Sequence, residues 1–183
     1  IQLMKISQKP VALHVDHGLT GGVIQHIEEL SEFVSENVIS ILLSPIPKTK
    51  NVCLKFGIED DDNKIIFDLN HDLESFNEII RSIPISYVHY HHIMNVPSEI
   101  LDLAGELNIP YLITVHDYYF LNGNPTLTNE QYVYPGNYSD LIINSAFSLP
   151  NKINPAEWRQ NLNHFWKNAT KVIFPSQSTK EFF

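Results

Sequence analysis

Residues 11–34 read VALHVDHGLTGGVIQHIEELSEFV, a run that joins a short strand, a glycine-rich turn and an amphipathic helix. The first five residues are apolar apart from His14, which predicts a strand that ends near Asp16. The turn over residues 18–22 contains three glycines. Beyond it, apolar residues recur on one helix face at Val23, Ile27, Leu30 and Val34. We therefore expect a helix over residues 22–36 and the start of a βαβ unit.

The rest of the chain repeats this alternation of short apolar runs and amphipathic segments. We expect further strands at residues 38–43, 51–56, 64–69, 85–89, 110–115 and 171–175. Further helices are expected at residues 73–82, 97–107 and from Asn154-Pro155 onward, the last with a core-facing stripe at Trp158, Leu162, Phe165 and Trp166. Asp60-Asp61-Asp62-Asn63 predicts the acidic tip of a β-hairpin, and residues 122–154 predict a long binding loop. The fold class expected is α/β: a Rossmann-like three-layer α/β/α domain with a mostly parallel sheet and an acidic β-hairpin.

Composition excludes several classes of protein. The chain has 183 residues, of which 43% are hydrophobic, so one domain with a sizeable core is expected. A net charge of −9 disfavours general binding to nucleic acid and a polybasic membrane anchor. Cys53 is the single cysteine, which excludes an intramolecular disulfide and a multi-cysteine metal site. No apolar run reaches the roughly 18 residues of a membrane span, and no signal peptide is evident at residues 1–10. A cytoplasmic protein is expected, with peripheral membrane contact left open.

The last residues carry a helix start signal. Ser178-Thr179-Lys180-Glu181 matches the capping box, and Phe182 and Phe183 then resemble the first apolar residues of a helix. We expect from this that the chain is a piece of a longer protein, with an ordinary frayed terminus as the alternative.

Candidate ligand-binding residues follow the expected parallel strands. Ligands of open α/β sheets bind beyond the carboxyl ends of the strands. Gly21 and Gly22 follow the first strand and precede a helix, so they could admit a diphosphate or a hydroxyl-rich ligand to the helix amides. A tight turn that needs glycine explains this pair equally well. Histidines gather near the carboxyl ends of three strands, at His14, His17, His89, His91, His92 and His116.

Metal binding by these histidines is not expected from the sequence. Strand alternation sends His89 and His91 to one face, with Tyr90 and His92 on the other. No H-E-x-x-H or similar fixed spacing is present, so we expect no metal site. Neutral imidazoles serve equally well as hydrogen-bond partners of ligand hydroxyl groups.

Four segments together resemble a known family. They are LTGGVIQH at residues 19–26, VHYHH at 88–92, TVHDYYFL at 114–121 and VIFPSQS at 172–178. In this order they look like the N-terminal half of GT-B glycosyltransferases, especially the retaining family 4 group. The resemblance covers nearly the whole chain.

The resemblance implies that residues 1–183 form the acceptor-side domain of a transferase whose donor-binding domain is absent from this chain. The whole enzyme would move a sugar from a nucleotide-sugar to a saccharide or lipid-linked acceptor, without a metal or other cofactor. It implies catalytic roles for His116 and Asp117. It also implies substrate-binding roles for five residues, namely Gly21, Gly22, His91, His92 and Tyr118. The chain by itself is expected to be inactive.

Two other classes of function stay open. One is a non-catalytic Rossmann-like module that binds a saccharide or a nucleotide. The other is a one-domain α/β enzyme such as an epimerase or reductase, which the missing G-x-G-x-x-G fingerprint disfavours.

Overall fold

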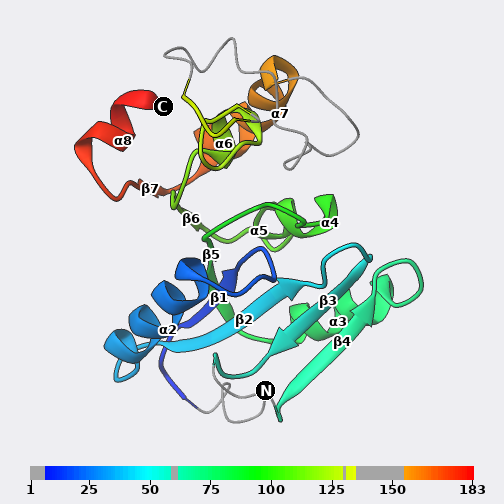
Figure 1. Ribbon diagram of the computed structural model, residues 1–183. Coiled ribbons are helices and arrows are strands. Elements are labelled where there is room, and N and C mark those ends of the chain that lie inside the picture. The colour runs from blue at the N-terminus through cyan, green and yellow to red at the C-terminus, as the bar shows by residue number, and fades with distance from the viewer. Residues whose placement is uncertain (1–6, 59–61, 130, 135–154) are drawn as a thin grey trace. The chain divides into compact units, whose positions relative to one another are not determined.

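The computed structural model describes residues 7–58, 62–129, 131–134 and 155–183 (Figure 1). The chain divides into two compact units, residues 1–114 and 115–183. Among the described residues, no helix is both long enough and apolar enough to cross a membrane.

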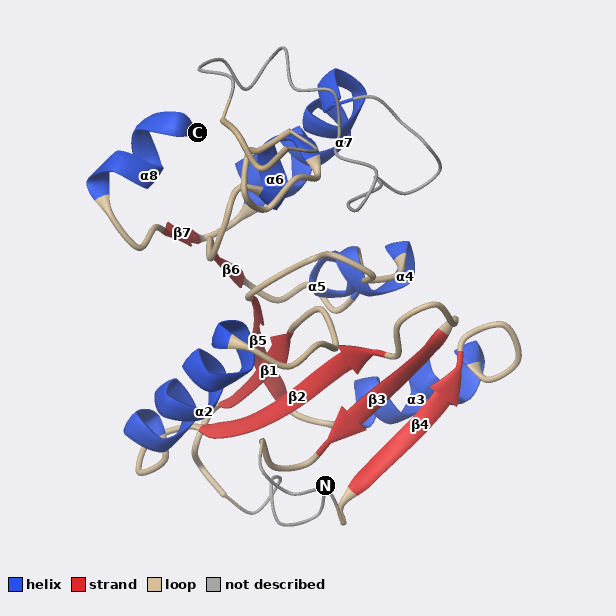
Figure 2. Ribbon diagram, viewed as in Figure 1, coloured by secondary structure: helices blue, strands red, loops and turns tan. Residues whose placement is uncertain are grey.

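The first unit is built on one mixed sheet. Its strands are β1 (Val11–Val15), β2 (Ile39–Pro45), β3 (Asn51–Lys55), β4 (Lys64–Asp68), β5 (Ile85–Tyr90) and β6 (Tyr111–Thr114). They lie side by side in the order β4–β3–β2–β1–β5–β6 (Figure 2). β1 is parallel to β2 and β5, and β5 is parallel to β6, whereas β3 is antiparallel to β2 and β4. The expected α/β class with a mostly parallel sheet is confirmed, and it is compatible with a Rossmann-like fold.

β1 occupies the centre of this sheet, and all five of its residues are buried. A parallel strand that is covered on both faces normally consists of apolar residues. The sequence VALHV follows this rule except at His14, which is only 1% exposed. A polar side chain is therefore held in the interior of the unit, and its surroundings decide what it can do.

The helices of this unit are α2 (Gly22–Val34), α3 (Leu73–Ser82), α4 (Ser98–Leu101) and α5 (Leu103–Glu106). α2 buries Val23 and Ile27 in one cluster with Leu42 of β2. α3 buries Phe76, whose ring meets that of Phe67 of β4 edge to face at a centroid distance of 5.4 Å. The apolar stripe of each helix thus attaches it to the sheet.

The helix expected over residues 97–107 is wrong in detail, because the structure has two short helices there. Asp102 separates α4 from α5 with a ψ of −6°, away from the helical value near −42°. The hairpin over β3 and β4 is formed, with Lys55 opposite Lys64. Asp60 and Asp61 of its expected acidic tip lie outside the described residues.

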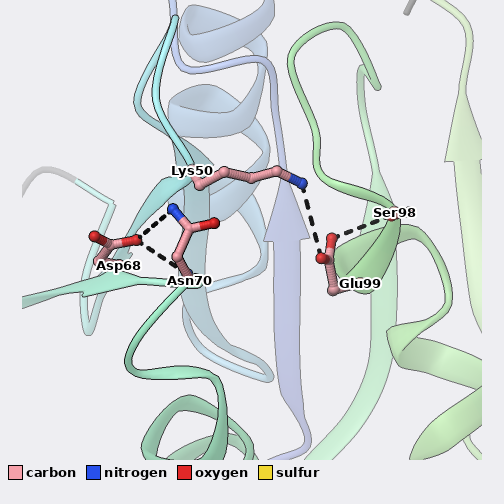
Figure 3. Close-up of polar contacts among 5 residues, drawn as sticks. All are labelled: Lys50, Asp68, Asn70, Ser98 and Glu99. Atoms are coloured by element: carbon pink, nitrogen blue, oxygen red, sulfur yellow. Dashed lines mark hydrogen bonds and ion pairs between the residues drawn. The ribbon is translucent and has the colours of Figure 1, made fainter. Parts of the chain in front are cut away.

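Polar contacts fix loops around the sheet (Figure 3). Asp68 accepts hydrogen bonds at 3.0 Å from both the backbone and the side-chain nitrogen of Asn70. Lys50, between β2 and β3, lies 3.8 Å from the carboxylate of Glu99 in α4. Both partners of this ion pair are partly exposed, so it contributes little to stability.

The second unit contains α6 (Tyr119–Asn122), α7 (Pro155–Asn168), β7 (Lys171–Ile173) and α8 (Gln177–Phe182). Trp158 of α7 is buried, and its indole nitrogen donates to the Tyr119 carbonyl at 3.1 Å. Trp158 and Leu162 are core residues as expected, whereas Trp166 lines a hollow. Residues 135–154 of the expected binding loop lie outside the described residues.

The N-cap of α8 differs from the expectation. Ser176, not Ser178, is the capping residue, and its hydroxyl accepts from the Thr179 amide at 3.0 Å. Ser178 lies inside the helix. Both serines are residue types that favour the N-cap, but only Ser178 has a glutamate three residues later. The extended backbone of Ser176 nevertheless makes it the cap.

Candidate functional site

Two loops meet at the carboxyl ends of β1 and β5 in the first unit. The His91 amide donates to the Val15 carbonyl at 2.8 Å, which continues the pairing of the two strands by one residue. The side chain of Asn95 donates to the His17 carbonyl at 3.4 Å. These bonds place the loop after β1 beside the loop after β5, at the edge of the sheet where ligands of such folds bind.

The three glycines of the first loop differ in whether the structure requires glycine at their positions. Gly18 has a φ of +70°, and a side chain there would collide with the Pro45 carbonyl oxygen. Gly21, the N-cap of α2, has a φ of +134°, which residues with a Cβ rarely adopt. Gly22 has neither constraint, and space is open around both Gly21 and Gly22. The sterics of the described chain therefore do not require glycine at position 22.

The start of α2 is open to a hydrogen-bond acceptor. Gly21 supplies no side-chain cap, and the first turn of the helix carries no acidic residue. The first amides of a helix have no partner within the helix and favour negative charge. A diphosphate or an oxygen-rich ligand could approach them across Gly21 and Gly22, as the sequence predicts.

A hollow of about 400 Å³ lies beside this loop within the first unit. The loop contributes Gly18, Leu19 and Thr20 to its wall. Its polar side chains include Asp16, directly after β1, Ser44 of β2, Lys55 of β3 and Lys64 of β4. Sequence reasoning did not find these four residues, because Lys55 and Lys64 come together only through the pairing of β3 with β4.

Asp16 is the buried carboxyl group of this hollow. It is 2% exposed, and one of its oxygens accepts from the Gly18 amide at 3.1 Å. Burial raises the pKa of this carboxyl above its usual value, although the hydrogen bonds and the charge of Lys55 oppose the shift. Asp16 thereby fixes the glycine loop and offers a polar group to the hollow.

The rings of His17 and His92 pack against each other at the same edge, with centroids 4.8 Å apart and ring planes tilted by 55°. Each ring accepts a backbone hydrogen bond at Nδ1, from Leu19 at 3.1 Å and from Met94 at 3.0 Å respectively. Each histidine therefore stabilises the conformation of the loop in which it lies. His92 is buried, and its expected contact with substrate stays a prediction.

The most concentrated histidine group joins β1 to β5. Nδ1 of His14 lies 2.9 Å from Nε2 of His91, and the ring centroids of His89 and His91 are 3.9 Å apart. All three side chains are buried. The expectation that His89 and His91 share a face is confirmed, but the sequence did not show that His14 joins them. Burial, together with the neighbouring His26, lowers the pKa of His14 to about 4, so this ring is neutral at physiological pH.

His116, Asp117 and Tyr118 lie in the second unit and are half-buried. The Asp117 carboxylate accepts from the Tyr119 amide at 2.9 Å, which starts α6. The ring of Tyr118 meets that of Phe182 edge to face at 5.3 Å. Asp117 and Tyr118 thus have local structural roles, and the catalytic and substrate contacts expected of all three residues stay predictions.

The second unit has a larger hollow of about 670 Å³. Aromatic and aliphatic side chains form most of its wall, including Phe120, Trp166 and Phe174. Arg159, Lys167 and Lys180 also line it. Phe120 and Phe174 belong to the segments 114–121 and 172–178 quoted above, but the sequence does not predict the hollow, because its wall combines α6, α7, β7 and α8.

Comparison with known proteins finds no matching family model, no matching curated protein and no matching solved structure. Function must therefore be inferred from the site itself.

Proposed function

We propose that this chain is the acceptor-side domain of a GT-B glycosyltransferase similar to family 4. The enzyme would transfer a sugar, with retention of configuration, from a nucleotide-sugar to a saccharide or lipid-linked acceptor. The observation that carries the proposal is the turn from β1 to α2. At this turn the fold could accommodate a Cβ at Gly22 without a clash. Open space surrounds the start of the helix, which has no side-chain cap.

The packing of helices on the sheet supports the three-layer arrangement that this fold requires. Residues paired across neighbouring strands share a face, so Leu42, Lys55 and Lys64 lie on one face. α2 packs against Leu42. Phe67, which contacts α3, is an odd number of residues from Lys64 and therefore lies on the opposite face. The two helices accordingly cover opposite faces of the sheet.

In this proposal the residues of the chain act by binding and orienting substrates. The amides at the start of α2 would stabilise negative charge on the diphosphate as the donor bond breaks. His116, with Asp117 beside it, would contact the sugar as positive charge develops on its ring. Gly21, Gly22, His91, His92 and Tyr118 are the proposed substrate-binding residues. A cationic partner for the diphosphate would come from the donor-binding domain, and no metal or other cofactor enters the reaction. We place the reaction in the cytoplasm, with peripheral membrane contact where the acceptor is lipid-linked.

A non-catalytic saccharide-binding or nucleotide-binding module is the second candidate. The hollow beside the glycine loop favours it, because Asp16, Ser44, Lys55 and Lys64 all belong to the first unit. Such a site could bind a hydroxyl-rich or phosphorylated ligand without a second domain.

The test compares the whole protein that contains this chain with the 183-residue chain alone, using a panel of labelled nucleotide-sugars and saccharide acceptors. We expect donor-dependent transfer by the whole protein and none by the chain alone. Gly22→Ala should reduce transfer, whereas Gly105→Ala should not. Gly105 is the matched control because a Cβ at either position meets open space. Saccharide binding without transfer by the whole protein would support the module instead, and neither binding nor transfer would contradict both candidates.

A further inference from the structure

Three buried histidines of the first unit converge from two neighbouring strands. His14 and His89 are directly paired in the register of β1 and β5, and His91 follows on the same face by alternation. One ligating nitrogen from each ring can be chosen so that all three lie within 4.8 Å of one another. The side chains are 1%, 4% and 0% exposed respectively. Buried polar groups normally have hydrogen-bond or metal partners, so three imidazoles this close together in the interior raise the question of what their nitrogen atoms bind.

Hydrogen bonds account for only part of this group. Nδ1 of His14 faces Nε2 of His91, and Nε2 of His89 lies 2.7 Å from the hydroxyl oxygen of Thr114. Nε2 of His14, however, is buried and has no hydrogen-bond partner among the residues that the structure describes. A buried polar nitrogen without a hydrogen-bond partner is unfavourable. A cation bound at this nitrogen would satisfy it. Because each neutral ring offers one lone pair, His91 binds the same cation only when its hydrogen bond with His14 is exchanged for coordination.

The donor set selects the class of cation. Imidazole nitrogen suits Zn²⁺ and the neighbouring d-block ions, while Ca²⁺ and Mg²⁺ prefer oxygen ligands. No carboxylate belongs to the group of His14, His89 and His91. Metal-binding histidines commonly use their second ring nitrogen to bond a hydroxyl, carboxylate or carbonyl group, and Thr114 occupies that position for His89.

A fourth imidazole lies beside the group, on the helix that covers this face of the sheet. His14 is paired with Leu42 in the sheet register, and α2 packs against Leu42, so the three histidines lie on the face covered by α2. His26 of α2 is half-buried, and its ring centroid lies 5.6 Å from that of His91. This helix therefore brings a further imidazole from the surface to the group.

We propose that His14, His89 and His91 bind one divalent d-block cation, with Zn²⁺ as the probe of choice. The site lies wholly within the first unit, and its ligand His91 is also one of the proposed substrate-binding residues, so metal binding is measured separately from sugar transfer. This proposal differs from the sequence-based expectation of no metal site. The sequence could not show the group, because the three histidines come together only through the pairing of β1 with β5.

The experiment uses the untagged 183-residue chain, stripped with chelator and dialysed. Zn²⁺ is titrated in competition with a chromophoric chelator, and the bound metal is counted by elemental analysis. We expect one equivalent of tightly bound Zn²⁺ and a higher melting temperature with metal, because a ligand that binds only the folded state stabilises it. No stoichiometric binding by the unsubstituted chain would overturn the proposal.

Substitutions locate the site. His14→Gln and His91→Gln should each weaken binding on the order of 100-fold or more, the upper range for loss of supporting groups around a metal. His71→Gln is the matched control, because His71 is an exposed histidine of the same unit and should leave binding unchanged. Unchanged binding in either cluster variant would overturn the assignment.

A spectroscopic measurement on the unsubstituted chain covers the case in which a cluster variant does not fold. Paramagnetic Co²⁺ should broaden the amide signals around residues 14, 89 and 91 at one equivalent. Broadening centred on His71 or on surface carboxylates would contradict the proposal.

Discussion

His14 Nδ1 in β1 lies 2.9 Å from His91 Nε2, although 77 residues separate the two in the chain. The parallel pairing of β1 with β5 makes this contact, since it sets His14 opposite His89 and extends to a backbone bond from His91 to Val15. The same pairing places the glycine loop next to the loop after β5. One pair of strands therefore builds both the proposed metal site and the proposed substrate edge.

Thr114 provides a test of the metal site outside its ligands. Its hydroxyl oxygen lies 2.7 Å from Nε2 of His89. Thr114→Val should lower Zn²⁺ affinity about 10- to 100-fold, because the ring of His89 loses the partner that fixes its orientation. Thr114→Ser, which keeps a hydroxyl, should restore most of the affinity. Equal affinities of the Val and Ser variants in the chelator competition would show that the hydroxyl does not support a metal ligand.

Gly21 and Gly22 should respond in opposite ways to alanine. Gly21→Ala should lower the free energy of unfolding by about 1–3 kcal/mol, because it forces a Cβ into a backbone with φ of +134°. Gly22→Ala should raise it by up to about 1 kcal/mol, because open space surrounds this helical position. Urea unfolding of both variants measures the difference. A destabilised Gly22→Ala would mean that packing, and not ligand approach, explains this glycine.

Tyr90 should stabilise the first unit through its hydroxyl. The hydroxyl donates to the carbonyls of Ile100 at 2.9 Å and Leu101 at 3.1 Å, and it joins β5 to α4. Tyr90→Phe should lower the free energy of unfolding by about 1–3 kcal/mol, since it removes the donor from buried acceptors. Tyr87→Phe is the control, because Tyr87 is half-exposed and should change stability by less than about 0.5 kcal/mol. Equal losses in both variants would contradict this role.

His116 tests the proposed transferase. If it contacts the sugar as charge develops, His116→Ala in the whole enzyme should lower kcat on the order of 100-fold, the scale of losing one preorganised group. The melting temperature should change little, because the side chain is half-buried. His164→Ala, at an exposed position of α7, should affect neither quantity. A near-normal kcat with a large drop in melting temperature would remove His116 from the active site.

Local sequence patterns predicted the principal elements of the first unit. The apolar spacing of α3 gave its observed bounds, and the predicted α2 extends only two residues beyond Val34. The pattern failed where backbone detail decides the structure. Asp102 interrupts the helix expected over residues 97–107, and Ser176 rather than Ser178 caps α8. Side-chain type alone does not distinguish these alternatives.

The sequence by itself determined the order of strands and helices in the first unit, the glycine turn after β1 and the gathering of histidines at strand ends. These features depend on which residue types lie two to four positions apart in the chain. Such local patterns can be read from the sequence through the strand and helix periodicities and the residue preferences of turns. Only the tertiary structure decided that His14 joins His89 and His91, and that Lys55 and Lys64 line a hollow with Asp16. Strand pairing and its register are long-range choices that minimise exposed apolar surface over the whole sheet, so no short stretch of residues encodes them.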